Sequence, residues 1–314
     1  MPPETRVVIV GCGRIAGDFN DRGGKVATHA AAYRERGAVL VGCCDVDRAR
    51  AERFGRRWGI EVSGDDLGAV LTRSQPQVVS VCTPPADQTA ALETVLAARS
   101  VRAVLIEKPL ATKAAEAENI RDLVRRAGRP TVVNYFRAFD PFYQALARAC
   151  EEGRFGRFCG GTLRYYGSAA ANASHMLERV IAMFGHSLDV KRLSGDPTTP
   201  VFELTIRGAR VLAVPTEGAR YSPVELDLLF DAHRVRVIDS ERRVEVFRSE
   251  ADPDYEGFEN LAPGAGWSGG APSHQSILQA VDETLRAARG LPVGDEVLDR
   301  AVLVTRILEE IGAV

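Results

Sequence analysis

A short apolar strand that runs into a glycine turn constrains the fold of this chain more than any other feature. Residues 7–10 are Val-Val-Ile-Val, a β-branched run that is typical of a strand buried on both faces. Gly11, Gly13 and Ala16 follow with the spacing G-x-G-x-x-A. The first small residue permits a tight turn, the second lets a pyrophosphate approach the backbone, and the third lets a helix pack closely on the strand. The pattern therefore predicts a dinucleotide site at this turn.

An acidic residue at the end of the next apolar run indicates which dinucleotide is bound. That run covers residues 39–44 and ends at Asp45. An aspartate there accepts hydrogen bonds from the adenosine ribose hydroxyls and repels a 2′-phosphate, which favours NAD over NADP. Arg48 and Arg50 follow closely and could bind that phosphate, so NADP stays open. The spacing from the glycine turn exceeds the roughly 20 residues usual for this fingerprint, and a polar insertion at residues 18–28 accounts for the excess.

The pattern of apolar residues changes along the chain and predicts two domains. Apolar runs ending near residues 82, 106 and 135 alternate with helical stretches, as in βαβ units of a parallel sheet. Further on, segments such as 201–206 and 224–230 alternate apolar and polar residues, as strands with one covered face do. We therefore expect an α/β fold: a doubly wound parallel sheet over residues 1–136, then an α+β domain with a large, mainly antiparallel open sheet over residues 137–314.

Three C-terminal segments complete this expectation. Residues 249–272 are rich in Gly and Pro, and we expect a loop long enough to be a lid or an arm at a subunit contact. Two helices, over residues 273–289 and 295–310, are expected to finish the second domain.

Charge and cysteine content exclude several classes of protein. The formal net charge of −2 leaves no basic excess for nucleic acid or an anionic membrane. No apolar run is long enough to span a bilayer, and the N-terminus enters the first strand without a leader, so we expect a cytoplasmic protein. The six cysteines have no C-x-x-C spacing, which favours free thiols in a reducing compartment and no metal site.

One lysine stands out because the chain uses arginine for nearly all its basic residues. Lys108 follows the strand predicted at residues 101–106, and doubly wound sheets bind ligands outside the carboxyl ends of their strands. A desolvated lysine can lose its proton at an accessible pH, whereas an arginine cannot. Lys108 is therefore a candidate general base. Of the 40 basic residues, four are lysines: Lys25, Lys108, Lys113 and Lys191.

Three motifs in this order resemble the Gfo/Idh/MocA family of nicotinamide-dependent oxidoreductases: the glycine turn, Cys82-Thr83-Pro84, and Glu107-Lys108-Pro109. The resemblance spans nearly the whole chain, including residues 134–137 and Ser174-His175. It implies a Rossmann domain followed by an open-sheet domain, with Lys108 and His175 as catalytic residues. The cofactor-binding residues that we expect are Gly11, Gly13, Arg14, Ile15, Ala16, Asp45, Thr83, Pro84, Glu107 and Lys108.

His175 precedes the apolar side chains of a predicted helix, so we expect it near the N-terminus of that helix. The helix dipole there disfavours a proton on the imidazole, which suits a neutral base. Many dehydrogenases of the family carry an Asp four residues before this histidine, where the chain has Ala171. Neighbouring Asn172 can orient a substrate hydroxyl but cannot exchange a proton. The general-base work then falls on Lys108, on His175, or on a tyrosine.

Other residues complete the expected site. The tyrosine candidates are Tyr165 and Tyr166, and Tyr166 is also expected to bind substrate. Arg137 ends the last parallel strand, where it could clamp a substrate carboxylate or phosphate, or instead form an interdomain salt bridge. His29 lies on an Ala-rich helix, either near the cofactor, as the resemblance implies, or in a purely structural place. Gln88 stands where the family often has a cofactor-contacting histidine.

These features predict an NAD(P)-dependent oxidoreductase that transfers a hydride between nicotinamide and a secondary alcohol or ketone of a sugar, cyclitol or nucleotide-sugar. The missing Asp leaves open a biosynthetic keto-sugar or imine reductase that uses NADPH. A non-catalytic dinucleotide or ligand sensor is a further alternative, because a fold alone does not establish an activity. The expected partners are a small polyhydroxylated substrate and further copies of the chain, in a homodimer or homotetramer formed through the C-terminal sheet.

Overall fold

The computed structural model describes residues 4–21, 26–264, 267, 270, 272 and 276–314. The chain divides into two compact units, which are described separately below. The first contains Met1–Phe139 and Gln275–Thr305, and the second contains Asp140–His274 and Arg306–Val314. Within the described residues, the helices are all too short or too polar to cross a membrane.

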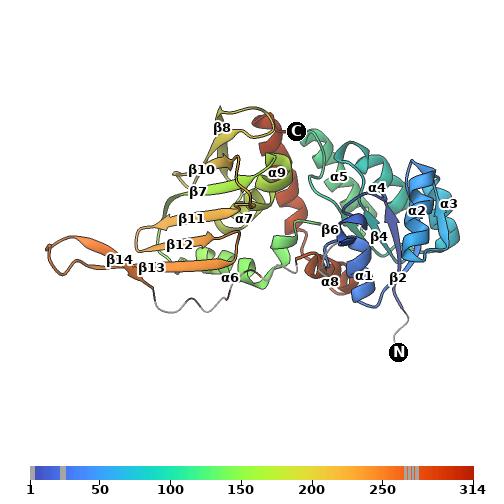
Figure 1. Cartoon of the computed structure of the whole chain (residues 1–314), viewed down its shortest axis with the longest axis horizontal. Helices are drawn as coiled ribbons and strands as arrows, with labels where there is room; N and C mark the ends of the chain where they lie inside the picture. Colours follow the sequence, from blue (N-terminus) through green and yellow to red (C-terminus); the bar gives the residue numbers. More distant parts are fainter. Residues whose placement is uncertain (1–3, 22–25, 265–266, 268–269, 271, 273–275) are drawn as a thin grey trace. The chain divides into compact units, whose positions relative to one another are not determined.

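The first unit is built on a six-stranded parallel sheet with the strand order β3-β2-β1-β4-β5-β6 (Figure 1). The order steps outward from β1 in both directions, so the carboxyl ends of β1 and β4 lie side by side. Doubly wound sheets bind their ligands at this switch point. The strands are β1 (Arg6–Val10), β2 (Val39–Cys44), β3 (Val62–Gly64), β4 (Val78–Val81), β5 (Ala103–Ile106) and β6 (Thr131–Val133). The predicted doubly wound sheet is confirmed, and β3 is a strand that sequence reasoning missed.

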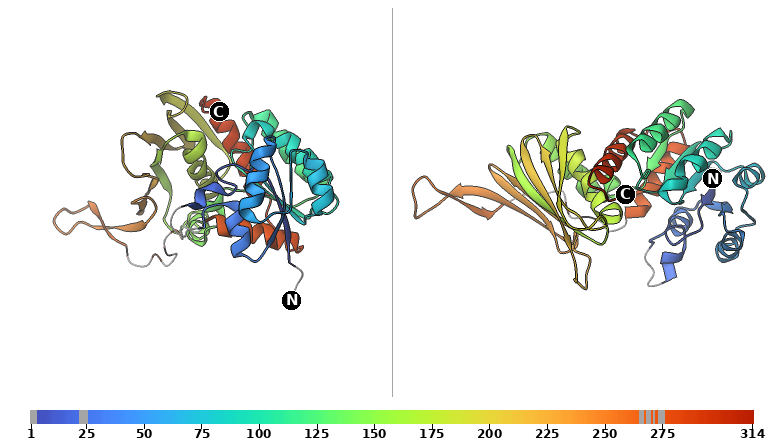
Figure 2. Two further views of the ribbon diagram at one scale, coloured as in Figure 1. Left: turned by 45° about the vertical axis from the view of Figure 1, so that its right-hand side comes forward. Right: turned by 90° about the horizontal axis from the view of Figure 1, so that it is seen from above.

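Helices cover both faces of this sheet (Figure 2). They are α1 (His29–Glu35), α2 (Arg48–Trp58), α3 (Leu67–Ser74), α4 (Gln88–Ala97), α5 (Ala114–Ala127) and α8 (Ser276–Ala288), with short 3₁₀ turns η1 (Asp18–Asp21), η2 (Pro85–Asp87) and η3 (Phe136–Phe139).

Helix α8 comes from far along the chain yet belongs to the core of the first unit. It packs against α1, β5 and β6. Its side chains Ile277 and Val281 share one buried cluster with Val7 and Leu105 of the sheet. The sequence-based division at residue 136 assigned this helix to the second domain. A parallel sheet needs apolar cover on both faces, and α8 supplies it over β5 and β6.

The helix expected directly after the glycine turn is interrupted. Residues 13–18 form a single helical turn, in which the amide of Asp18 bonds the carbonyl of Arg14 at 2.9 Å. The helical hydrogen bonding then resumes at α1, where the amides of His29 and Ala30 bond the carbonyls of Ile15 and Ala16 at 3.2 and 2.9 Å. The residues before and after the polar insertion are therefore joined by helical hydrogen bonds. Residues 22–25 of that insertion lie outside the described residues.

The second unit is built on an eight-stranded sheet with the order β14-β13-β12-β11-β7-β10-β9-β8. Strands β7 and β10 pair in parallel, and the other neighbours pair antiparallel. The predicted large, mainly antiparallel open sheet is thus confirmed. Its strands are β7 (Phe158–Tyr166), β8 (Leu188–Ser194), β9 (Val201–Ile206), β10 (Ala209–Thr216), β11 (Glu225–Phe230), β12 (His233–Ile238), β13 (Arg243–Ala251) and β14 (Glu259–Pro263).

Helices cover one face of this open sheet (Figure 2). Helix α6 (Pro141–Glu151) packs against α7 (Ser174–Phe184), which a π-helical segment (Ala169–Ala173) precedes. Phe184 of α7 stacks on Phe158 of β7, with ring centroids 3.9 Å apart. On the other face, charged residues of neighbouring strands pair with one another, as Arg234 does with Asp227. The last helix of the chain is α9 (Glu296–Glu310).

A hairpin replaces part of the loop that was predicted over residues 249–272. Strand β13 continues to Ala251 and pairs with β14, so that Ala251 faces Glu259, and the pair extends as an arm from the sheet (Figure 1). The loop prediction was wrong here because most side chains of this hairpin are exposed or only half-buried, so no apolar alternation marks its strands. Strand β8 was missed for the same reason. Parts of the predicted loop, and the start of the predicted helix at residue 273, lie outside the described residues.

Candidate active site

The glycine turn has the geometry that a bound dinucleotide needs. Gly11 has a φ of +84°, and a Cβ there would lie 2.8 Å from the carbonyl carbon of Cys82, so the turn packs directly on the end of β4. Gly13 is open instead, because a Cβ placed there would have no neighbouring atom within 4 Å. This open side lets a ligand reach the backbone. A pocket of about 470 Å³ adjoins it, lined by Cys12, Gly13, Arg14, Asp18, Arg50, Arg53, Phe54 and Arg57.

Asp45 lies beside this pocket at the end of β2. Its carboxylate accepts hydrogen bonds from the backbone amides of Cys12 at 2.8 Å and Asp47 at 2.9 Å, and the Arg50 guanidinium lies 3.4 Å away. The backbone bonds fix the carboxylate against the glycine turn. Four arginines line the pocket around it: Arg14, which was expected to bind the cofactor, together with Arg50, Arg53 and Arg57. Of the two arginines that could bind a 2′-phosphate by the sequence analysis, Arg50 lines the pocket and Arg48 does not. The site therefore offers both an acceptor for ribose hydroxyls and donors for phosphate oxygens.

The remaining residues predicted in the first unit follow three adjacent strands. Thr83 and Pro84 come after β4, Glu107 and Lys108 after β5, and Arg137 after β6. Because the order β4-β5-β6 is uninterrupted, their carboxyl ends form one edge of the sheet. The buried hydroxyl oxygen of Thr83 has no hydrogen-bond partner among the described residues. An unpartnered buried acceptor at this edge fits the polar groups of a bound cofactor.

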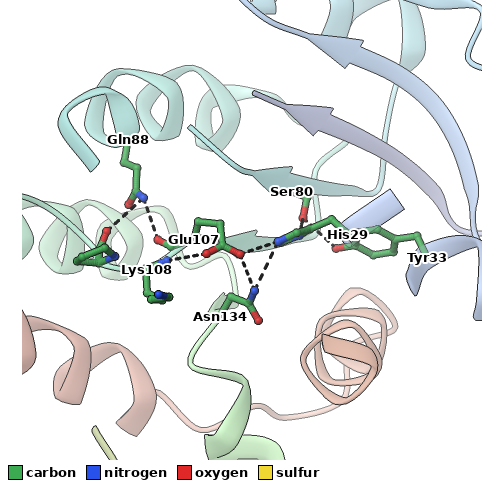
Figure 3. A network of polar contacts seen from close by, with 8 residues as sticks. His29, Tyr33, Ser80, Gln88, Glu107, Lys108 and Asn134 are labelled. Carbon is green, nitrogen blue, oxygen red and sulfur yellow. Dashed lines mark hydrogen bonds and ion pairs between the residues drawn. The ribbon is translucent and has the colours of Figure 1, made fainter. Parts of the chain in front are cut away.

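Glu107 is the centre of a buried polar network (Figure 3). Its carboxylate Oε1 lies 2.7 Å from His29 Nε2 and accepts a bond of 2.5 Å from the Asn134 side-chain amide. The other oxygen, Oε2, accepts a bond of 3.2 Å from the backbone amide of Lys108. On the far side of the imidazole, His29 Nδ1 lies 2.7 Å from the hydroxyl of Ser80. Glu107, which was expected to bind the cofactor, thus has its carboxylate occupied by internal partners.

The charges of this network depend on one another. Burial opposes a charge on the fully buried His29, but Cys82 and the bonded Glu107 favour it and raise the pKa of the imidazole to about 10. Burial likewise opposes a charge on Glu107, but the hydrogen bond and charge of His29, followed by Asn134 and Lys108, lower the pKa of its carboxyl. The contact between the two side chains therefore favours an imidazolium paired with a carboxylate.

Lys108 lies next to this pair. Burial lowers the pKa of its ammonium, Glu107 opposes that change, and the positive charge of Arg137 adds to it. The structure thus brings Lys108 and Arg137 together at the sheet edge, as predicted for ligand-facing residues. A lysine with a lowered pKa has more of the neutral amine at a given pH and can accept a proton.

Gln88 has a role that sequence reasoning missed. Its amide Nε2 donates to the backbone carbonyls of Glu107 at 2.8 Å and Pro109 at 3.3 Å (Figure 3). The side chain therefore fixes the Glu-Lys-Pro turn. Ser80 in the same network was also missed as a site residue, whereas Asn134 was expected on the ligand side, at the end of the last parallel strand. The available signal for Ser80 was positional, since it is a polar residue within an apolar strand.

The other predicted site residues belong to the second unit. His175 is buried in α7, one residue after its start. The helical segment as a whole begins earlier, because the π-helical residues run into α7 and Ser168 caps them by accepting from the amide of Ala171 at 3.1 Å. His175 therefore lies near the N-terminus of α7, as predicted, although π-helical residues precede that helix, and the dipole effect on its imidazole stays a prediction. Asn172 lies three residues before His175 and donates to the carbonyl of Tyr166 at 2.6 Å.

The two candidate tyrosines point to opposite faces of the second sheet. Tyr165 is fully buried and donates to the carbonyl of Pro200 at 2.5 Å, and burial raises the pKa of its phenol. Both effects hold its proton in place, which makes it a poor base. Tyr166 is 42% exposed on the other face.

Comparisons with known proteins show what this chain is similar to. Residues 5–135 match the Gfo/Idh/MocA model, which describes an oxidoreductase family with an NAD-binding Rossmann fold. The chain is 32% identical over 149 residues to a D-apiose dehydrogenase of Paraburkholderia graminis and 30% identical over 151 residues to an inositol 2-dehydrogenase of Saccharopolyspora erythraea. These matches cover 47% and 48% of this chain but 36% and 41% of the relatives, so they span less than half of each curated relative.

The whole fold is shared with solved structures. An oxidoreductase from Agrobacterium radiobacter, crystallised with NAD⁺, L-tartaric acid and magnesium, superposes with a TM-score of 0.73 over 99% of this chain and 96% of its own, at 18% identity. Residues 5–135 are thus similar to the NAD-binding Rossmann domain of the Gfo/Idh/MocA oxidoreductase family, and the solved structure shares the fold of the whole chain.

Proposed function

We propose that this chain is an NAD(P)-dependent oxidoreductase that transfers a hydride between nicotinamide and a secondary alcohol or ketone of a sugar, cyclitol or nucleotide-sugar. The observation that carries the proposal is Lys108, with a lowered pKa, at the sheet edge that begins at the open glycine turn. The dehydrogenases of apiose and inositol to which the chain is similar support a polyhydroxylated substrate.

Lys108 is the proposed general base. Oxidation of the alcohol removes the hydroxyl proton and a hydride from the carbinol carbon and leaves a carbonyl group. Lys108 Nζ takes the proton in this direction and returns it in the reverse direction. The nicotinamide, when bound, accepts or supplies the hydride. Arg137 assists by disfavouring the charged form of Lys108 and can hold an anionic group of the substrate.

Residues of the second unit are proposed to bind and orient the substrate. His175 is the proposed second catalytic residue, as a partner for the reacting hydroxyl or its neighbour. Asn172 and Tyr166, which already contact each other, are proposed to bind further substrate hydroxyls. Because Ala171 replaces an acid, none of these three groups supplies a carboxylate to share the proton.

The cofactor end of the site favours NAD through Asp45. One observation also supports the reductive alternative with NADPH: Arg50, Arg53 and Arg57 line the same pocket and can bind a 2′-phosphate. Fluorescence titration of the purified protein with NADH and with NADPH separates these possibilities. Micromolar binding of NADH would justify a screen of cyclitols and aldoses for oxidation with NAD⁺. Tighter binding of NADPH would justify a screen of keto-sugars for reduction. Binding of neither would reject the proposal and favour a sensor of other ligands.

The catalytic role of Lys108 has a matched control. Lys108→Met keeps much of the side-chain length but removes the proton acceptor, so turnover should fall by about 10²- to 10⁴-fold while NADH binding stays within about twofold. Lys113→Met makes the same change at an exposed lysine at the start of α5 and should leave both unchanged. Equal turnover of the two variants would mean that the protein is a sensor or uses another base.

We also propose a homodimer or homotetramer in the cytoplasm, associated through the open face of the second sheet. That face carries no helix, and it offers the exposed Leu229 and Tyr166 among charged side chains. The six cysteines are free thiols, which suits a reducing compartment. Light scattering after size exclusion measures the mass, and Leu229→Arg should shift it to the 34.0 kDa monomer.

A further inference from the structure

His29 is a buried titratable residue of the first unit that the proposed reaction does not use. It is fully buried, yet both of its ring nitrogens have polar partners: Nε2 lies 2.7 Å from Glu107 Oε1 and Nδ1 lies 2.7 Å from Ser80 Oγ. The Ser80 hydroxyl lies 3.5 Å from that of Tyr33, one turn further along α1 (Figure 3). The imidazole is therefore held from both sides and bridges two adjacent strands.

The carboxylate that His29 holds is joined to Lys108 in two ways. The backbone amide of Lys108 donates to Glu107 Oε2, so the carboxylate fixes the peptide from which the lysine side chain departs. The charge of Glu107 also acts on the ammonium of Lys108. Gln88 holds the same peptide from the other side, through the carbonyl of Glu107. His29 thus contacts Glu107, the residue that fixes the backbone of Lys108.

The charged groups around the pair come from several elements. Two groups face His29: Glu107 at the end of β5 and Cys82 at the end of β4. The ammonium of Lys108 is affected by the charge of Glu107 and by that of Arg137, which follows β6. Helix α8 also packs against α1, but its Asp282 is paired at 2.6 Å with Arg36 at the exposed end of α1. Glu107 is therefore the link through which a charge on His29 reaches Lys108.

We propose that His29 is a positioning residue that acts on Lys108 through Glu107, by holding the carboxylate in one orientation and by balancing its negative charge. The proposal rests on the proposed function only in that Lys108 is the base. An uncompensated carboxylate beside Lys108 would attract its ammonium form and keep the proton on it. The imidazolium offsets that attraction, and Lys108 can then release its proton at a lower pH.

The same arrangement orients Asn134. A carboxylate only accepts hydrogen bonds, so Glu107 requires the amide nitrogen of Asn134 to face it, at 2.5 Å. The amide oxygen then faces away, and this buried oxygen has no partner among the described residues. Asn134 is thereby held as an acceptor for a ligand N–H or O–H.

The small number of lysines allows a direct test on the intact protein. With ¹³C,¹⁵N-lysine labelling, four Cε signals are expected, and Lys108→Arg identifies that of Lys108. We expect His29→Gln, which can hydrogen-bond but not carry charge, to raise the pH at which Lys108 titrates by about one pH unit. Glu107→Gln should lower it. His233→Gln, the same change at a half-buried histidine of the second unit, should not move it. An unchanged or lowered Lys108 titration in His29→Gln would overturn the proposal.

A measurement on the unmodified protein covers the case in which His29→Gln does not fold. In ¹⁵N-histidine spectra at pH 8, the His29 ring should carry protons on both nitrogens, and a neutral ring there would reject the proposal. Where a substrate is found, the acidic limb of kcat/KM against pH should move with the Lys108 titration, with KM little changed. If neither NADH nor NADPH binds, the proposed function fails, whereas the lysine and histidine titrations still decide the coupling.

Discussion

Two buried ion pairs, one in each unit, are built in opposite ways. His29 and Glu107 come from different elements, α1 and the end of β5, and their contact of 2.7 Å is one bond in a network that includes Ser80 and Asn134. Glu178 and Arg179 are neighbours on α7, and two bonds of 2.5 Å join the carboxylate to the guanidinium. The first pair therefore connects distant segments, whereas the second neutralises charge within one helix.

The two pairs show that a buried charge can either be neutralised locally or connect distant segments of the fold. Both pairs pay the cost of leaving water, and in both the partner offsets it. The local pair of α7 does not depend on how the β-strands are arranged, and it neutralises charge inside a mostly buried helix. The pair in the first unit exists only when β4, β5, β6 and α1 are assembled. Its charge balance is therefore tied to the sheet edge that carries Lys108.

The largest effect is expected at the local pair. Arg179→Met leaves the Glu178 carboxylate buried without its cation, and we expect a loss of about 3–5 kcal/mol in unfolding free energy. Adding Glu178→Gln should recover most of that loss, because no charge then remains. Urea unfolding measures both, with Arg242→Met at an exposed position of the second unit as control. If Arg179→Met lost no more unfolding free energy than the control, the Glu178–Arg179 pair would not stabilise the second unit.

An intermediate effect, with a pH dependence, is expected at the connecting pair. The pKa of His29 is raised from 6.5 to about 10, so its contribution to stability is complete below pH 6.5 and disappears as the pH rises toward 10. The pKa of Glu107 is lowered from 4.5, so its contribution is present above pH 4.5 and is lost as the pH falls.

Glu107→Gln removes the contribution of Glu107 and the part of the His29 contribution that comes from their contact. We expect a loss of about 1–3 kcal/mol between pH 5 and 6.5, which shrinks toward pH 10. Urea midpoints of wild type and variant across this range provide the measurement. A difference that is constant with pH would show that the pair is not charged and that shape alone holds it.

The smallest effect is expected at an exposed pair that also connects distant segments. Arg36 and Asp282 join α1 to α8 by two bonds of 2.6 and 2.8 Å, with side chains 34% and 44% exposed. Asp282→Asn should cost about 0.2–1 kcal/mol, and less in 1 M salt, because solvent screens the charges. A cost equal to that of Glu107→Gln would mean that separation along the chain, and not burial, sets the strength of these pairs.

Local patterns were sufficient for the parts of the fold in which neighbouring residues determine the outcome. The apolar runs before Gly11 and Asp45 are strands because β-branched residues fill a sheet buried on both faces, and the E-K-P motif was placed correctly at the end of β5. The pairing of α8 with the first sheet was not predictable in this way, because an amphipathic helix shows which side it buries but not against what.

In the candidate site, too, only the features that neighbouring residues determine could be predicted from the sequence. Lys108 and Arg137 were expected at the carboxyl edge, where the structure has them, because strand ends define that edge. The distant partners of the Glu107 carboxylate could not be deduced, since His29 of α1 and Asn134, directly after β6, are 78 and 27 residues away along the chain. The hairpin arm and the π-helical start before His175 were missed because polar or small residues carry no periodic signal there.

The interrupted helix also affects how relatives of this protein can be recognised. The amides of His29 and Ala30 bond the carbonyls of Ile15 and Ala16, so the residues between them add length to the chain without adding a turn to the helix. A search that counts residues from the glycine motif to the acid will pass over such a chain. Counting hydrogen-bonded turns avoids this error, because the bonds from His29 and Ala30 to Ile15 and Ala16 continue the helix across the insertion.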